Sequence, residues 1–340
     1  MRPFLRCPIL FPDGNRYAIL YSGMSNKRHL NDLEFCYRML IDRYGFDKNK
    51  IYVLTYDGTL NTQDGVQTNW PGDNTPYRIH VNNQGNKASF KAVFNTLKGK
   101  LKANDLLFIH TNNHGDNNGT ESFLCTYPSW GTYMASEFCA DLATLPQYRS
   151  LIVMMEQCNS GGFNLPVLAA STANNSSIAS AAIATQSSYV SADGNWDPFA
   201  RDWIAAQAGH TAFGTALAHN PDGNGNGVIE AEEAYEYALS VQDPRDSPNF
   251  NESSEAGGDI TLGQHYIFWW WWCYIIYPIL VRYYRPLPPD PEWYEKIQEI
   301  MPELSRLVVP GMDRAAVDMR KEVSEKVEEV VRKAIGKNKK

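Results

Sequence analysis

Five short apolar runs recur along the first half of the chain, and most of them are almost continuously apolar. They occupy residues 17–21, 51–56, 106–111, 151–156 and 178–185. Strands read this way when both faces are covered, because neither face then meets water. The pattern therefore predicts a mostly parallel central sheet that is buried between two layers of helices.

Segments with helical periodicity separate the apolar runs. Residues 30–44 place Leu33, Tyr37 and Leu40 on one side, and residues 88–101 show the same spacing of apolar positions. Strands that alternate with helices predict an α/β three-layer sandwich. In such sheets the chemically active side chains gather beyond the carboxyl ends of the strands.

The composition changes sharply near residue 264 and predicts three parts. These are a globular domain at 12–264, an aromatic hydrophobic segment at 265–285 and a helical tail at 286–340. Residues 266–281 carry no charge and include four consecutive tryptophans. As a helix they would span ~24 Å, less than the ~30 Å hydrocarbon core of a bilayer. Membrane attachment through 266–281 and packing against the domain both stay open.

The tail contains an amphipathic segment at 312–335, with apolar residues at three- and four-residue steps. This spacing is typical of a helix that associates with a partner, and equally of one that packs on its own domain. The first eleven residues are too short an apolar run for a secretory signal, so we expect a cytoplasmic or membrane-associated protein with the compartment unassigned.

Charge and cysteine spacing exclude several classes of function. The 340 residues carry a formal charge of -7, which argues against nucleic acid as the main partner. None of the six cysteines forms a Cys-x-x-Cys pair, so a zinc ribbon is not expected. We expect no organic cofactor.

Two strand-end motifs carry the strongest chemical signal. One apolar run leads into His114-Gly115, and the next leads into Cys158 followed by small residues. Neighbouring parallel strands can bring a thiol and a base together at one edge of the sheet. Backbone N–H groups near Cys158 and Gly115 would then face the oxyanion of a tetrahedral intermediate.

These motifs resemble the legumain-like cysteine peptidases, which are related to caspases and gingipains. His-Gly after one strand and Glu-x-Cys-x-Ser-Gly after the next carry the resemblance, and it extends from about residue 16 to residue 264. It implies a caspase-like fold. It also implies a cysteine endopeptidase that works through a thioester intermediate.

The resemblance assigns roles to individual residues. Cys158 would be the nucleophile, His114 the general base and acid, and Asn26 the residue that orients the histidine. The residues implied to line the pocket for the side chain before the scissile bond are Arg28, Glu156, Ser187 and Asp202. A pocket with both signs of charge suits a carboxamide, so we expect cleavage after Asn, then after Asp at acid pH. A preference for Arg or Lys stays open.

Residues 222–233 match the pattern of an EF-hand loop. Oxygen ligands would come from Asp222, Asn224, Asn226, the backbone of Val228 and Glu233. We therefore expect one structural Ca²⁺, with a helix over 234–241 after the loop and an entering helix over 211–218. The alternative is an Asn/Gly-rich turn that caps a helix.

Other interpretations of the same residues remain. A transpeptidase or transamidase would use the same dyad with an amine in place of water. A catalytically silent, calcium-binding caspase-like interaction module would use neither His114 nor Cys158. Single residues also have ordinary explanations: His110 and most of the cysteines read as core residues, and Arg28 with Asp202 could be a surface ion pair.

Overall fold

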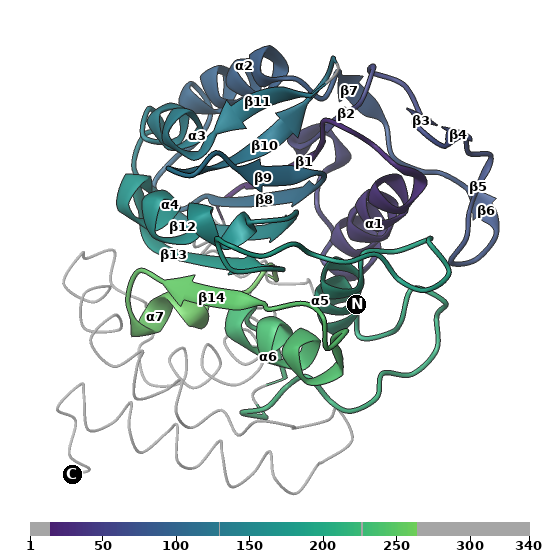
Figure 1. Ribbon diagram of the computed structural model, residues 1–340. Coiled ribbons are helices and arrows are strands. Elements are labelled where there is room, and N and C mark those ends of the chain that lie inside the picture. The colour runs from purple at the N-terminus through teal and green to yellow at the C-terminus, as the bar shows by residue number, and fades with distance from the viewer. Residues whose placement is uncertain (1–13, 129, 226, 264–340) are drawn as a thin grey trace, which may run out of the picture. The chain divides into compact units, whose positions relative to one another are not determined.

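The computed structural model describes residues 14–128, 130–225 and 227–263. The predicted aromatic segment at 265–285 and the predicted tail at 286–340 lie outside the described residues. The chain divides into two compact units, and residues 12–223 and 229–262 form the unit that contains the sheet (Figure 1). Within the described residues, every helix is too short or too polar to cross a membrane.

A seven-stranded sheet lies at the centre of this unit. Its strands, in spatial order, are β14 (Asn249–Glu252), β13 (Ala173–Ser180), β12 (Tyr148–Glu156), β8 (Leu106–Asn112), β1 (Arg16–Ser22), β2 (Ile51–Thr55) and β7 (Val81–Asn83). All neighbours pair in parallel except β14, which runs antiparallel to β13. The predicted mostly parallel sheet is confirmed.

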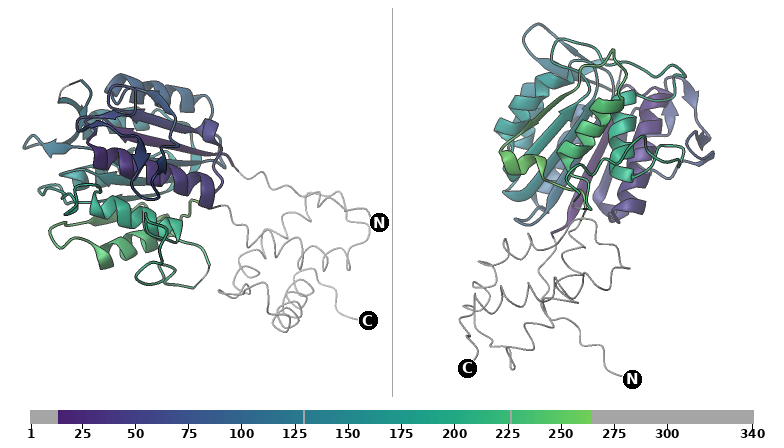
Figure 2. Two further views of the ribbon diagram at one scale, coloured as in Figure 1. Left: turned by 90° about the vertical axis from the view of Figure 1, so that its right-hand side faces the viewer. Right: turned by 90° about the horizontal axis from the view of Figure 1, so that it is seen from below.

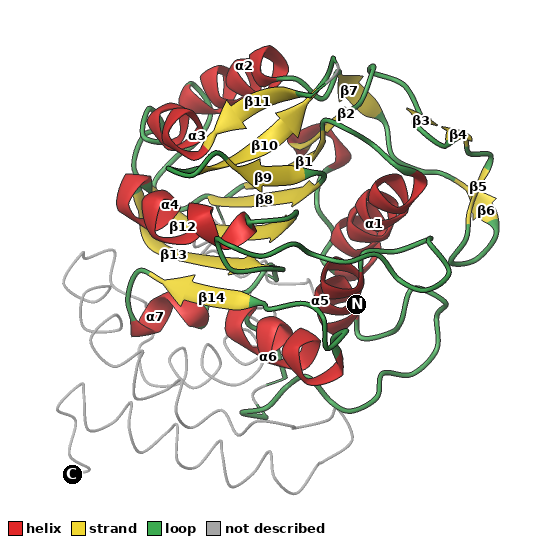
Figure 3. Ribbon diagram, in the orientation of Figure 1, coloured by secondary structure: helices red, strands yellow, loops and turns green. Residues whose placement is uncertain are grey.

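Helices cover both faces of the sheet (Figures 2 and 3). One face carries α1 (Lys27–Arg38), its π-helical continuation (Met39–Arg43), α5 (Pro198–Ala208) and α6 (Ala231–Val241). The other face carries α2 (Lys87–Lys98), α3 (Ala135–Leu142) and α4 (Asn164–Ala170). A short helix, α7 (Glu255–Gly258), follows β14.

Alternation along the strands divides the buried residues into two cores. In β1, Ala18 and Leu20 pack under α1 and α5, whereas Tyr17, Ile19 and Tyr21 pack under α2 and α3. A strand buried on both faces is apolar at nearly every position, which explains the continuous apolar runs. The structure is therefore the three-layer, caspase-like sandwich that the sequence predicts.

Smaller elements fill the long connections. A three-stranded sheet of β9 (Gly115–Asn117), β10 (Ser122–Thr126) and β11 (Gly131–Met134) follows β8. Two hairpins, β3 (Asn61–Thr62) with β4 (Gly65–Val66) and β5 (Asn69–Trp70) with β6 (Thr75–Pro76), lie between β2 and β7. Single 3-10 turns occur at Lys48–Lys50 and Ser160–Phe163.

One predicted strand lies at a shifted position, and one predicted helix is replaced by turns. The strand expected at 178–185 is β13 (Ala173–Ser180), because its first half is polar and partly exposed near the edge of the sheet. The helix expected over 211–218 is a set of turns, in which the left-handed Gly214 (φ 72°) and the Thr211 hydroxyl close a short loop. The predicted loop therefore lacks its entering helix.

Candidate active site

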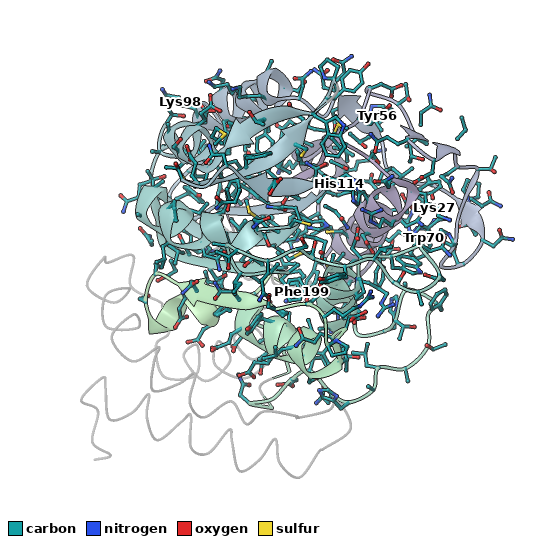
Figure 4. All side chains as sticks on the ribbon, in the orientation of Figure 1. Lys27, Tyr56, Trp70, Lys98, His114 and Phe199 are labelled. Carbon is teal, nitrogen blue, oxygen red and sulfur yellow. The ribbon has the colours of Figure 1, made fainter. Side chains whose placement is uncertain are left out.

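The pairing of β8 with β12 brings the two strand-end motifs to the same level. In this parallel pair Asn112 lies opposite Glu156, and Asn113 N–H donates to Glu156 O at 3.0 Å. His114 and Cys158 each stand two residues beyond that pair. Two parallel strands in this register deliver both side chains to the same edge of the sheet. Figure 4 labels His114 beyond the strand ends.

Cys158 occupies a sharp turn at the end of β12. The next residue, Asn159, adopts a left-handed conformation (φ 59°), and its Nδ2 donates to Ala184 O at 2.8 Å. The Cys158 Sγ lies 3.8 Å from Ser188 O and 4.0 Å from Ser188 Oγ. Cys158 is partly exposed, whereas the other free cysteines of the described residues are buried: Cys36, Cys125 and Cys139. The thiol of Cys158 is the one that a substrate can reach in this part of the chain.

His114 is held by an amide and by two rings. Its Nε2 lies 2.7 Å from Asn26 Oδ1. Its ring packs edge-on against His29 at 5.1 Å between centroids, and Trp130 lies at 5.5 Å on another side. An amide oxygen only accepts, so Nε2 carries the proton and Nδ1 is the basic nitrogen.

The surroundings of His114 favour a neutral imidazole. Burial, followed by the positive charge of Arg28, lowers the pKa of His114 to about 4, and the negative charge of Asp64 acts in the opposite direction. A neutral imidazole can take a proton from a thiol, whereas a protonated one cannot. His110, inside β8, is fully buried, as its position in the strand predicts.

Gly115 is required by close packing of the two strand ends. A Cβ atom at this position would lie 2.7 Å from Gln157 Cγ and 2.8 Å from Cys158 O. Both distances are too short for any side chain. The backbone after His114 therefore lies against the backbone of Cys158, which only glycine allows.

Four buried carboxylates form an acidic cluster beside these strand ends. The cluster is Asp32 on α1, Glu156 at the end of β12, Asp197 before α5 and Asp246 before β14. Arg28 Nε donates to Asp197 Oδ1 at 2.8 Å, and Asp197 N–H donates to Asp32 Oδ2 at 2.9 Å. Glu156 accepts from the N–H of Ala200 at 2.8 Å.

Each carboxylate of the cluster has one oxygen that no hydrogen bond from the described part of the chain satisfies. Within the described residues, Asp32 Oδ1, Glu156 Oε1, Asp197 Oδ2 and Asp246 Oδ2 are buried without a hydrogen-bond partner. Burial raises the pKa of Asp197 to about 7 against the opposing charge of Arg28, and raises the pKa of Asp246 to about 6. Burial and neighbouring carboxylates also raise the pKa of Asp32 and of Glu156. The cluster can therefore hold protons itself.

The predicted pocket residues have different neighbours in the structure. Arg28 pairs with Asp197, whereas Asp202 pairs with its neighbour Arg201 at 2.7 Å. Ser187 is exposed, and the following residue, Ser188, is the one in contact with the Cys158 sulfur. The alternative explanation of Arg28 and Asp202 as an ion pair with each other is therefore wrong, and the predicted pocket roles of Ser187 and Asp202 stay predictions.

The chain matches one family model. The Peptidase C13 family matches residues 16–214, which include both strand ends. The chain belongs to the Peptidase C13 family. This is the legumain family of cysteine peptidases, so the resemblance stated from the motifs is confirmed, and the family acts on peptide or protein substrates.

No curated protein matches the chain. Among solved structures, protein GSU0716 from Geobacter sulfurreducens matches with a TM-score of 0.46 and 12% sequence identity, over 73% of this chain and 97% of that chain.

Sequence reasoning missed Asp197, Asp246 and Asp64 of this C13 domain. Asp197 directly precedes Pro198 at the start of α5, a position at which an acidic residue is ordinarily a helix cap. The Asp-Pro start of a helix was the available signal for Asp197. Asp246 and Asp64 lie in polar loops, which carry no such signal.

The predicted calcium loop is only partly described. Residues 224–228 belong to the other compact unit, and Asn226 lies outside the described residues. The Glu233 carboxylate accepts from Gly223 N–H at 2.9 Å and from Glu230 N–H at 3.1 Å, so it joins the start of the loop to the start of α6. The described residues contain no group of three or more His, Cys, Asp or Glu side chains that could hold a metal.

The raised pKa of Asp246 predicts a pH-dependent stability. Its folded-state pKa of about 6 lies above the usual value of 3.8, so the free energy of unfolding falls as the pH rises from about 4 to about 6. Asp246→Asn keeps an oxygen for Tyr189 N–H and removes this titration. The expected difference between the two proteins over that range is well below about 3 kcal/mol, since one pH unit corresponds to about 1.4 kcal/mol and solvent screens a group that is not fully enclosed.

Urea unfolding of wild type and Asp246→Asn at several pH values between 4 and 7 measures this difference. The wild-type protein should lose more stability than the variant as the pH rises. If the free energy of unfolding changes with pH in the same way in both proteins, the pKa of Asp246 is not raised in the folded state.

Proposed function

We propose that this C13 family member is a cysteine endopeptidase with Cys158 as nucleophile and His114 as general base and acid. The observation that carries the proposal is the register of β8 and β12, which puts the two residues level at one edge of the sheet. The bond from His114 Nε2 to Asn26 supports it, because it leaves Nδ1 as the basic nitrogen.

In the proposed reaction the thiol proton moves to His114 Nδ1 as Cys158 Sγ attacks the substrate carbonyl. The tetrahedral intermediate collapses to a thioester, and His114 gives the proton to the departing amine. Water then attacks the thioester with His114 again as base, the C–S bond breaks to release the acid product, and His114 returns the proton to the Cys158 thiolate. We assign the oxyanion to backbone N–H groups near Gly115 and Cys158, where the two strand ends approach most closely.

We further propose that cleavage follows Asn. A carboxamide needs a donor for its oxygen and acceptors for its NH₂ group, and Arg28 and the acidic cluster provide the two kinds of partner next to each other. Asp would be accepted at acid pH, where its side chain is neutral. The substrate contacts proposed here are Arg28, Glu156 and Asp197, with Asp197 in the place first given to Asp202.

A cleavage assay tests the dyad. Wild type is expected to hydrolyse a peptide with Asn before a reporter amine, and Cys158→Ala and His114→Ala each to lose at least about 1,000-fold in kcat/KM. Cys139→Ala, at a buried cysteine in α3, is the matched control and should keep wild-type activity. Companion peptides with Asp, Arg or Lys before the reporter measure the residue preference.

Two results would contradict the proposal. One is hydrolysis that survives Cys158→Ala unchanged. The other is inactivity of wild type toward all four peptides after any activating cleavage, which would favour the silent interaction module. Mass spectrometry with an added amine separates hydrolysis from transpeptidation, because both begin from the same thioester.

A matched pair of variants tests the pocket. Asp197→Asn is expected to lower kcat/KM for the Asn peptide by about 10- to 100-fold, because a buried charged partner of Arg28 is lost. Asp202→Asn changes the same residue type in the same helix region and should have a smaller effect. Equal losses in the two variants would argue against Asp197 as the pocket carboxylate.

We also propose that the loop at 222–233 binds one structural Ca²⁺. Its donors are all oxygens, from Asp222, Asn224, Asn226, the backbone of Val228 and Glu233, which is the donor set that Ca²⁺ prefers. The bonds from Glu233 to both the loop start and the helix start support a carboxylate that faces the loop.

Thermal unfolding with and without Ca²⁺ tests this site. Wild type should unfold at a higher temperature in excess Ca²⁺, because binding to the folded state stabilises it. Glu233→Gln should remove most of that increase, whereas the control Glu232→Gln, at the exposed neighbouring position, should keep it. An increase that is the same in both variants, or absent in wild type, would refute the site.

A further inference from the structure

The β3–β4 hairpin is attached to the segment that carries Asn26. Gln63 N–H donates to Ser25 O at 2.7 Å, and Lys27 N–H donates to Asp64 Oδ2 at 2.7 Å. Asn26 Nδ2 donates to the other oxygen of the same carboxylate, Asp64 Oδ1, at 3.5 Å. One turn of the hairpin therefore contacts three consecutive residues at the start of α1, where Figure 4 labels Lys27.

The turn itself fixes the position of the Asp64 carboxylate. Asp64 N–H donates to Thr62 Oγ1 at 3.2 Å, and Thr62 Oγ1 in turn donates to Gly65 O at 2.8 Å. Gly65 has a φ of 109°, a conformation that requires glycine. The hydrogen-bonded turn therefore fixes the position of the Asp64 carboxylate next to Asn26, and the short side chain adds little freedom.

These contacts determine which end of the Asn26 amide faces His114. A carboxylate only accepts, so Asn26 turns its NH₂ group to Asp64 and its oxygen to His114 Nε2, 2.7 Å away. The opposite orientation would place the oxygen against the carboxylate and lose the bond to Asp64, and it would require His114 Nε2 to be the unprotonated nitrogen. An asparagine that precedes a helix ordinarily uses its oxygen on helix N–H groups. Here Asp64 accepts from the first of those groups, at Lys27.

We propose that Asp64 is a positioning residue for the dyad. Through Asn26 it holds His114 in the tautomer with the proton on Nε2, so that Nδ1 is the nitrogen available to the Cys158 thiol. The inference rests on the proposed function, in which these two residues form the dyad. In this account Asp64 of the hairpin orients the Asn26 amide, and the Asn26 amide orients the His114 ring.

The charges around His114 predict the direction in which loss of Asp64 shifts the pKa of His114. The ionisable groups that act on it are Arg28 and His29 from α1 and Asp64 from the hairpin. Burial lowers the pKa of His29 well below its usual range, so His29 is neutral. Arg28 lowers the pKa of His114 and Asp64 raises it. Loss of the Asp64 charge should therefore move the acid limb of the activity profile to lower pH.

Kinetics of two variants test the role. Asp64→Asn preserves shape but offers one oxygen in place of two acceptors, and Asp64→Ala removes both. Each is expected to lower kcat on the order of 10-fold or more with KM within about 2-fold, because orientation of the base is lost while substrate contacts remain. Gln63→Ala is the matched control, since it keeps the backbone bond to Ser25 and alters only an exposed side chain.

A double variant separates positioning from simple support of the loop. If Asp64 acts through Asn26, adding Asp64→Ala to Asn26→Ala should cause little further loss in kcat. Losses that multiply would overturn the proposal, as would an unchanged acid limb in Asp64→Asn. Circular dichroism spectra and melting curves of every variant check that the fold is intact.

Histidine NMR in the Cys158→Ala background tests the inference without any catalysis. Asp64→Asn is expected to lower the pKa of His114 and to shift its ring away from the single tautomer, and Gln63→Ala to do neither. If the pKa and the tautomer of His114 are unchanged in Asp64→Asn, the positioning role is refuted, even if the protein is an active peptidase. An inactive wild-type protein whose His114 responds to Asp64→Asn would refute the proposed function and support the positioning role.

Discussion

The site depends on the register between β8 and β12. Parallel pairing places Asn112 opposite Glu156 at the ends of the two strands. His114 and Cys158 each follow two residues later, so both leave the sheet at the same edge. A shift by one residue would send either side chain to the opposite face of the sheet. The register is held by two hydrophobic cores that alternate along each strand, and by Gly115, which lets the two strand ends approach. Packing of the two cores therefore also sets the relative positions of His114 and Cys158.

The start of α1 serves the site in three ways at once. Asn26 contacts His114, Arg28 pairs with Asp197 of the acidic cluster, and His29 packs against the ring of His114. Burial of several carboxylates beside one arginine destabilises their charged forms. The pKa values of these carboxyl groups are therefore raised toward neutral pH. Such an arrangement is typical of a functional site, because a core built only for stability would avoid unpartnered buried carboxylate oxygens.

Much of the architecture follows from local patterns in the chain. Continuous apolar runs predicted the sheet, because residues buried on both faces leave no polar alternation, and the strand-end motifs located His114 and Cys158. The pocket was harder. Asp197 reaches Arg28 across 169 positions in the sequence, through a loop whose path depends on the packing of α5. β13 begins with polar residues because it lies next to the edge strand, so its start had no apolar signal. Asp64 and the absent entering helix depend likewise on turns, which hydrophobic periodicity does not report.

The central claim is that a sulfur and an imidazole meet beside a carboxamide-binding group of charges. A crystal structure of the protein inactivated by a peptide ketone with Asn at its reactive end tests this most directly. We predict a thioether at Cys158, His114 next to the sulfur, and the Asn side chain between Arg28 and the acidic cluster. A modified cysteine other than Cys158, or an Asn side chain directed away from Arg28, would contradict the account.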